Sequence, residues 1–263
     1  MINSMQKAII KKDLRFVLTN KGLLTSLIVV PLVFTVIFPA MFILIFHFVP
    51  EDLGDFQELL NMMPSSQVSE SLSRAVMAMI MDFVMPTFFI IVPVIAASTM
   101  AAGSFVGEKE KRTLETLLYC PLPLKKIFES KVLASFFLSM VVTLISFVVM
   151  QIVVQTLVFL TTGSMLAPGL AWIFIILVVS PAVSLLAITM IVGGSAKAKT
   201  MEESFQRSAF MILPMVFMAT AQLSGIVLIN AWFLLAFGII VAIIAAVLLK
   251  RSMRKYTYEA LLR

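Results

Sequence analysis

The residues best suited to bind a partner lie in one charged stretch, residues 107–131, which reads GEKEKRTLETLLYCPLPLKKIFESK. Leu114, Leu117 and Leu118 recur there at i, i+3 and i+4, which places them on one face of a short helix. Pro121 ends that helix, because proline lacks the amide donor and its ring clashes with the preceding turn. A leucine face with nothing inside the chain to pack against predicts a helix that docks onto a partner protein.

Charged residues cover the other side of this predicted docking helix. The leucines would supply buried anchors, and Glu108, Glu110 and Glu115 would pair with a basic partner surface. The alternative is that these charges only mark a membrane boundary. The predicted docking residues are Gly107, Glu108, Glu110, Arg112, Thr113, Leu114, Glu115, Leu117 and Leu118.

The composition of the chain indicates the elements that must hold this stretch in place. Its 263 residues are 61% hydrophobic and 13% charged, whereas a soluble domain is about 25% charged. The mean hydropathy of +1.08 is that of an integral membrane protein. A single cysteine, Cys120, excludes an internal disulfide, and with one histidine, His47, it excludes a Cys/His metal site within one chain.

Apolar runs predict an all-α protein with six transmembrane helices, each about the 20 residues needed to cross a bilayer or longer. The first run lacks the small-residue cleavage site of a signal peptide. Residues 107–130 form the loop between spans 2 and 3. The predicted spans are residues 22–49, 76–105, 131–160, 168–193, 208–229 and 231–249.

Residues 1–21 predict an amphipathic helix on the membrane surface. Lys7, Lys11 and Arg15 recur at i, i+4 and i+8, opposite a broad apolar arc. A helix of this kind lies in the interface of an anionic leaflet. The alternative is an ordinary flank of the first span.

The distribution of basic residues predicts the orientation. Of the 20 lysine and arginine residues, all except Arg74 fall on one side of the predicted topology. The acidic residues divide almost evenly, so the bias is the positive-inside asymmetry. Both termini, the 107–130 loop and a second polar loop at residues 195–207 are therefore expected in the cytoplasm.

Polar residues within the later spans are the candidates for a transport pathway. Outside the 195–207 loop, no charged residue or histidine lies between residues 131 and 249. A pathway would therefore use Gln151, Gln155 and Gln222, the first two on one face of a helix. The alternative is that these amides join helices by hydrogen bonds. The 19 methionines would offer an adaptable lining or serve as ordinary packing.

These features together resemble the permease subunit of ABC-2-type transporters. The family's pattern after span 2 is matched by a glycine–glutamate start, a Thr-x-Glu, a proline, a basic pair and a lysine before span 3. Arg112 stands where many members have glycine, which would stiffen the approach to the docking helix. The loop AKTMEESFQ is similar to the family's second cytoplasmic loop. Its residues of interest are Met201, Glu202, Glu203 and Phe205.

The resemblance implies a single transmembrane domain over residues 1–263 in a bacterial cytoplasmic membrane. Family permeases pair with a second permease copy, identical or paralogous, and bind two copies of an ATP-binding cassette ATPase. ATP and magnesium would lie on those subunits, since this chain has no G-x-x-x-x-G-K-[ST] loop. Membrane lipid is an expected partner and nucleic acid is not. Compact family members mostly export drugs, amphipathic peptides, ions or lipid-linked sugars.

Two other classes of membrane protein lack support in the sequence. An intramembrane enzyme would need a motif such as H-E-x-x-H or paired aspartates, and the sequence has neither. A stand-alone channel would usually carry ionisable residues in its spans. The sequence favours a permease that exports an amphipathic or hydrophobic substrate, with sodium extrusion by the same architecture as the alternative.

Overall fold

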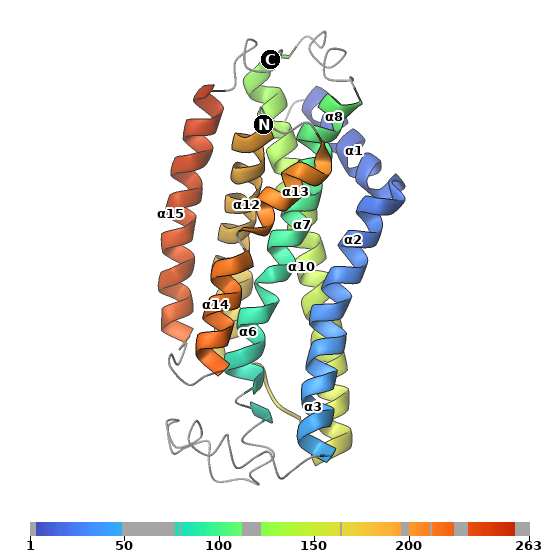
Figure 1. Cartoon of the computed structure of the whole chain (residues 1–263), viewed down its shortest axis with the longest axis vertical. Helices are drawn as coiled ribbons and strands as arrows, with labels where there is room; N and C mark the ends of the chain where they lie inside the picture. The colour runs from blue at the N-terminus through green and yellow to red at the C-terminus, as the bar shows by residue number, and fades with distance from the viewer. Residues whose placement is uncertain are drawn as a thin grey trace.

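Hydrocarbon gives the backbone no hydrogen-bond partners, so spanning segments must satisfy their own amide groups as helices. The computed structural model describes residues 4–48, 77–78, 80–111, 122–163, 165–195, 200–210, 212–223 and 231–255, and these residues contain helices and no strand. Figure 1 shows the helices aligned in one bundle.

The π-helical segments are η1 (Val33–Ile37), η4 (Ile80–Val84), η5 (Ala102–Val106) and η6 (Ile175–Val179). The α-helices are α1 (Ser4–Thr19), α2 (Lys21–Leu32), α3 (Phe38–Phe48), α6 (Met85–Phe89), α7 (Ile91–Ala101), α8 (Gly107–Glu110), α10 (Leu124–Thr162), α11 (Leu170–Phe174), α12 (Ser180–Ser195), α13 (Met201–Ala209), α14 (Ile212–Leu223) and α15 (Ala231–Lys255).

Among the described residues, five continuous helices are long and apolar enough to cross a membrane, where six spans were predicted. The predicted fifth span is represented in the described residues by α14, which has 12 residues and a length of about 18 Å. That is short of the roughly 30 Å of hydrocarbon, and residues 224–230 lie outside the described residues. The five long helices are Lys21–Ile45, Ile80–Glu110, Leu124–Thr162, Leu170–Ser195 and Ala231–Met253.

Two helices extend beyond the apolar runs that predicted them. The second span continues as a helix to Glu110, and α10 begins at Leu124, seven residues before the predicted start of the third span. Hydropathy locates the membrane boundary, whereas charged residues remain helical beyond it. As a result, Glu108 and Lys131 lie on helices that continue directly into the spans.

The second span lies at the centre of the bundle. In its most apolar stretch 82% of the residues are buried, against 22% in the first and last spans. Ala96, Ala97 and Ala101 are fully buried, and such small residues let neighbouring helices approach closely. Helix α7 packs against α2, α10 and α12. These alanines therefore allow the three neighbouring helices to pack closely around the second span.

An aromatic cluster and a carboxylate join spans at the end of the bundle away from α1. Trp172 is buried, stacks edge-on against Phe89 and donates its indole N–H to the carbonyl oxygen of Met81 at 3.1 Å. Next to it, the backbone N–H of Gly169 donates to Asp82 Oδ1 at 2.9 Å. Gly169 caps α11, so Asp82 connects the second span to the start of the fourth.

The Gly169→Ala variant is expected to lower the thermal stability of the protein. A Cβ at this position would lie 2.7 Å from Asp82 Oδ2, so the carboxylate must turn away and lose a charge-assisted bond worth about 1.5–3 kcal/mol. Thermal melting in detergent measures the loss. In an Asp82→Ala background the same glycine substitution should cost far less, and equal costs in both backgrounds would contradict the contact.

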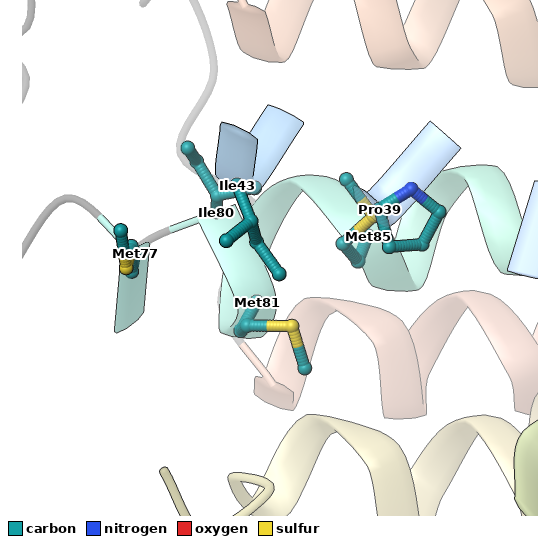
Figure 2. Close-up of a pocket in the computed structure, with 6 residues that line it drawn as sticks. All are labelled: Pro39, Ile43, Met77, Ile80, Met81 and Met85. Carbon is teal, nitrogen blue, oxygen red and sulfur yellow. The ribbon is translucent and has the colours of Figure 1, made fainter. Parts of the chain in front are cut away.

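The same end of the bundle contains a small methionine-lined pocket. Figure 2 shows Met81 and Met85 of the second span around it, with Met77 just before that span and Pro39 and Ile43 of the first span. Its volume of about 10 Å³ is room for roughly one water molecule. Here the methionines pack between spans 1 and 2. At this position they serve as ordinary packing and not as the lining of a pathway.

Candidate functional site

Helix α1 packs onto the bundle through a face that includes polar residues. Gln6, Ile9, Asp13 and Val17 are buried at i, i+3, i+7 and i+11, whereas the apolar side chain of Met5 is 43% exposed. Lys7, Lys11 and Arg15 are exposed, on the side that the sequence predicts for them. The apolar face of α1 therefore carries an acid into the bundle, and that acid needs a partner there.

The partner is Lys131 of α10, whose side chain is 1% exposed. Its Nζ lies 2.7 Å from Glu108 Oε2 and 3.6 Å from Asp13 Oδ2. It also donates a hydrogen bond of 2.5 Å to the backbone carbonyl oxygen of Ser104 in η5. One buried ammonium group thus contacts α1, the end of the second span and α8.

Two further contacts balance the charge of this cluster. Lys12 forms an ion pair with Glu108 Oε1, and the Ser104 hydroxyl donates to Asp13 Oδ2 at 2.5 Å. Two lysines therefore face two carboxylates, which is the compensation that buried charges require. We call this group of Lys12, Asp13, Ser104, Glu108 and Lys131 the charged junction.

Burial dominates the electrostatics of Asp13. Its pKa is raised above the usual value because loss of water disfavours the carboxylate, and Lys131 and the Ser104 hydroxyl only partly oppose this. A pKa that is higher in the folded than in the unfolded state makes folding favour the protonated acid. The stability associated with Asp13 is therefore lost as the pH rises through its folded pKa.

Two glycines on one face of the second span allow other elements to approach the junction. A Cβ on Gly103 would lie 3.1 Å from Leu23 Cδ1, and one on Gly107 would lie 3.0 Å from Met201 Sδ. Phe16 of α1 contacts both positions. The Nζ of Lys111 lies 4.3 Å from the centre of the Phe16 ring, a cation–π distance.

The second polar loop reaches the junction through α13. The backbone N–H of Glu203 donates to the Thr200 hydroxyl at 3.2 Å, the N-cap contact of a T-x-x-E sequence. The N–H of Met201 donates to Glu110 Oε2 at 3.0 Å. Figure 1 shows α1, α8 and α13 at the same end of the bundle. The two polar loops predicted to lie on one side of the membrane therefore meet through Glu110.

The structure brings some of the predicted site residues together and leaves others apart. Gly107, Glu108, Glu110 and Met201 converge at or beside the junction, while Glu202 is exposed. Residues 112–121, and with them Arg112, Thr113, Leu114, Glu115, Leu117 and Leu118, lie outside the described residues, as does the side chain of Phe205.

Asp13, Ser104 and Lys131 are not among the predicted site residues. A signal for Asp13 was present, because it lies four residues from Ile9 and four from Val17, on the apolar face of α1. Lys131 fitted the family pattern but was interpreted as the start of a span. Ser104 contributes its backbone carbonyl oxygen, and the role of a backbone group cannot be inferred from the residue type.

The glutamines of the candidate pathway are only partly described. Gln155 Oε1 accepts from the N–H of Leu166 at 3.1 Å, and its amide nitrogen donates to the carbonyl of the same residue. Gln155 thus joins α10 to the following connection, as the alternative to a pathway role supposes. Gln151 Nε2 is buried without a hydrogen-bond partner among the described residues, and the side chain of Gln222 lies outside them.

The long apolar helices and the compensated charges at their ends define a multi-pass membrane protein. Residues 7–231 match the ABC-2 family transporter proteins, and the chain belongs to that family. The matched region contains the whole charged junction. No curated protein and no solved structure matches the chain. As an ABC-2 membrane component the chain carries no catalytic ATPase domain, and its family membership implies an ATPase partner.

Proposed function

We propose that this chain is the permease subunit of an ATP-driven exporter in a cytoplasmic membrane. Two permease copies bind two cassette ATPase subunits, which hold ATP and magnesium. Both chain termini, the charged junction and α13 face the cytoplasm, in agreement with the basic residues at that side. The predicted docking helix within residues 112–121 follows directly after Lys111 and contacts the ATPase.

The observation that carries this proposal is the burial of Lys131 between Glu108 and Asp13. Glu108 is one of the predicted docking residues and lies on α8, four residues before the undescribed residues 112–121 that contain the predicted leucine face. A displacement of that segment by the ATPase would move α8, and the ion pairs would carry the movement to α10 and α1. The junction then connects ATP-driven motion to span 3 and to the surface helix.

The spans favour an amphipathic or hydrophobic substrate over an ion. Residues 132–249 contain no charged residue outside the 195–207 loop. The lysine that precedes them, Lys131, is buried in the junction. Ion paths through membranes usually depend on ionisable side chains. A peptide, antibiotic or lipid-like molecule would instead enter from the cytosol or the adjacent leaflet.

ATP turnover by the reconstituted complex is expected to rise with amphipathic peptides or lipid-like compounds. The measurement compares ATP hydrolysis by proteoliposomes containing permease and ATPase with and without each compound. The purified permease alone should hydrolyse no ATP, which is the control. Stimulation by sodium alone would reject the substrate class, and turnover by the isolated chain would reject the permease assignment.

A further inference from the structure

A groove of about 250 Å³ runs between the first and third spans on the outer surface of the bundle. Ile28, Pro31 and Leu32 of α2 form one wall, and Ile145 and Val149 of α10 form the other. Figure 1 shows these helices next to each other, and α10 packs against α2, η1 and α3. Ile28 and Ile145 are 53% and 59% exposed, so the groove opens away from the bundle towards the hydrocarbon.

The hydroxyl of the threonine in the groove wall is already hydrogen-bonded within its own helix. The hydroxyl of Thr35, which also lines the groove, donates to the carbonyl oxygen of Pro31 at 2.8 Å. All residues that line the groove are uncharged. The surface is therefore suited to a hydrocarbon chain.

The groove begins at the depth of the acyl chains of the leaflet at the α1 end. Lys21, at the start of α2, lies on the same helix face as Ile28 and Leu32, seven and eleven residues further on. At 1.5 Å per residue, the groove extends from about 9 to 21 Å below Lys21. Half of the hydrocarbon core measures about 15 Å, so the first half of the groove lies beside the distal part of an acyl chain whose head lies near Lys21, and the rest continues about 6 Å past the bilayer midplane.

Exposed basic residues lie at the end of the bundle where that head would be. Lys21 is exposed, and the adjoining helix α1 exposes Lys7, Lys11 and Arg15. Cationic residues at the membrane surface attract anionic lipids. A second copy of the chain packed into the groove would bring apolar side chains but would make no use of Lys21.

We propose that the groove between α2 and α10 is a binding site for an anionic phospholipid of the leaflet at the α1 end. Its phosphate pairs with Lys21, and one acyl chain lies along Ile28, Leu32, Ile145 and Val149. The site is separate from the charged junction, so it requires no assumption about the transported substrate.

Photolabelling tests this site on the full chain in nanodiscs. The probes are phosphatidylglycerol and phosphatidylcholine, each with a diazirine near the end of one identical acyl chain. Phosphatidylglycerol should label the walls of the groove, at residues 28–35 of the first span and 142–149 of α10, more strongly than phosphatidylcholine. Lys21→Gln should reduce this preference about fivefold, the contribution of one basic residue at the surface. Peptide mass spectrometry locates the label.

Matched tryptophan variants control for general effects on the membrane surface. Ile145→Trp fills the groove and should suppress the label, whereas Ile240→Trp on α15 should not, although Ile240 is 57% exposed. Equal labelling by both lipids, or label spread equally onto α15, would overturn the proposal. So would disulfide cross-linking of two copies through Ile145→Cys with Cys120 removed, because a second copy would then occupy the groove.

Discussion

Replacing Lys131 with methionine is expected to destabilise the protein by about 3–5 kcal/mol, the usual effect of removing one partner from a buried ion pair. Methionine fills a similar volume and is compatible with a helix, so the loss would come from charge. Asp13 and Glu108 would remain buried without the ammonium group that lies 3.6 and 2.7 Å from them. Thermal melting and size-exclusion chromatography in detergent measure the effect.

Lys126 provides a matched control for this variant. It lies on the same helix, five residues earlier, and is exposed. Lys126→Met should change stability by no more than about 0.5 kcal/mol, as surface substitutions do. Neutralising the carboxylates of the Lys131→Met variant with Asp13→Asn and Glu108→Gln should restore much of its stability. Equal melting of the two lysine variants would contradict a structural role for the charged junction.

Replacing Leu117 and Leu118 together with aspartate is expected to abolish binding of the ATPase while the permease still inserts. Each leucine contributes roughly 1.5–3 kcal/mol at full burial, so losing both weakens binding by about a hundredfold or more. The two introduced carboxylates would also have to enter an apolar surface. Pull-down of the ATPase from detergent extracts, with permease levels held equal, measures the loss.

Glu115→Ala is the control on the same predicted helix. A solvated carboxylate contributes about 0–1 kcal/mol, so this variant should retain most of the partner. Normal recovery of the ATPase by the double aspartate variant would show that residues 112–121 are not the docking site. That outcome would leave the charged junction and the family membership unaffected.

The amino-acid sequence alone determined the class of protein and the approximate course of the chain. Long apolar runs such as the one in α10 must be helical in hydrocarbon, whatever their neighbours, because the backbone has no other way to satisfy its amides. The charged motif that begins at Gly107 was sufficient to indicate the family, which the match over residues 7–231 confirms. The fifth of the six predicted spans is represented in the described residues by the 12 residues of α14.

The tertiary structure alone decided which charged residues meet. Lys131, Ser135, Ser139 and Thr143 recur at every fourth position of α10 and are buried, so its sequence indicates the inward face but not the elements that this face contacts. The rotation of α10 that buries Lys131 is set by packing against α1 and α7, elements far away in the chain. Asp13, Glu108 and Lys131 therefore form one site only because three helices pack in this arrangement, and side-chain packing between distant helices is not encoded in the periodicity of any one of them.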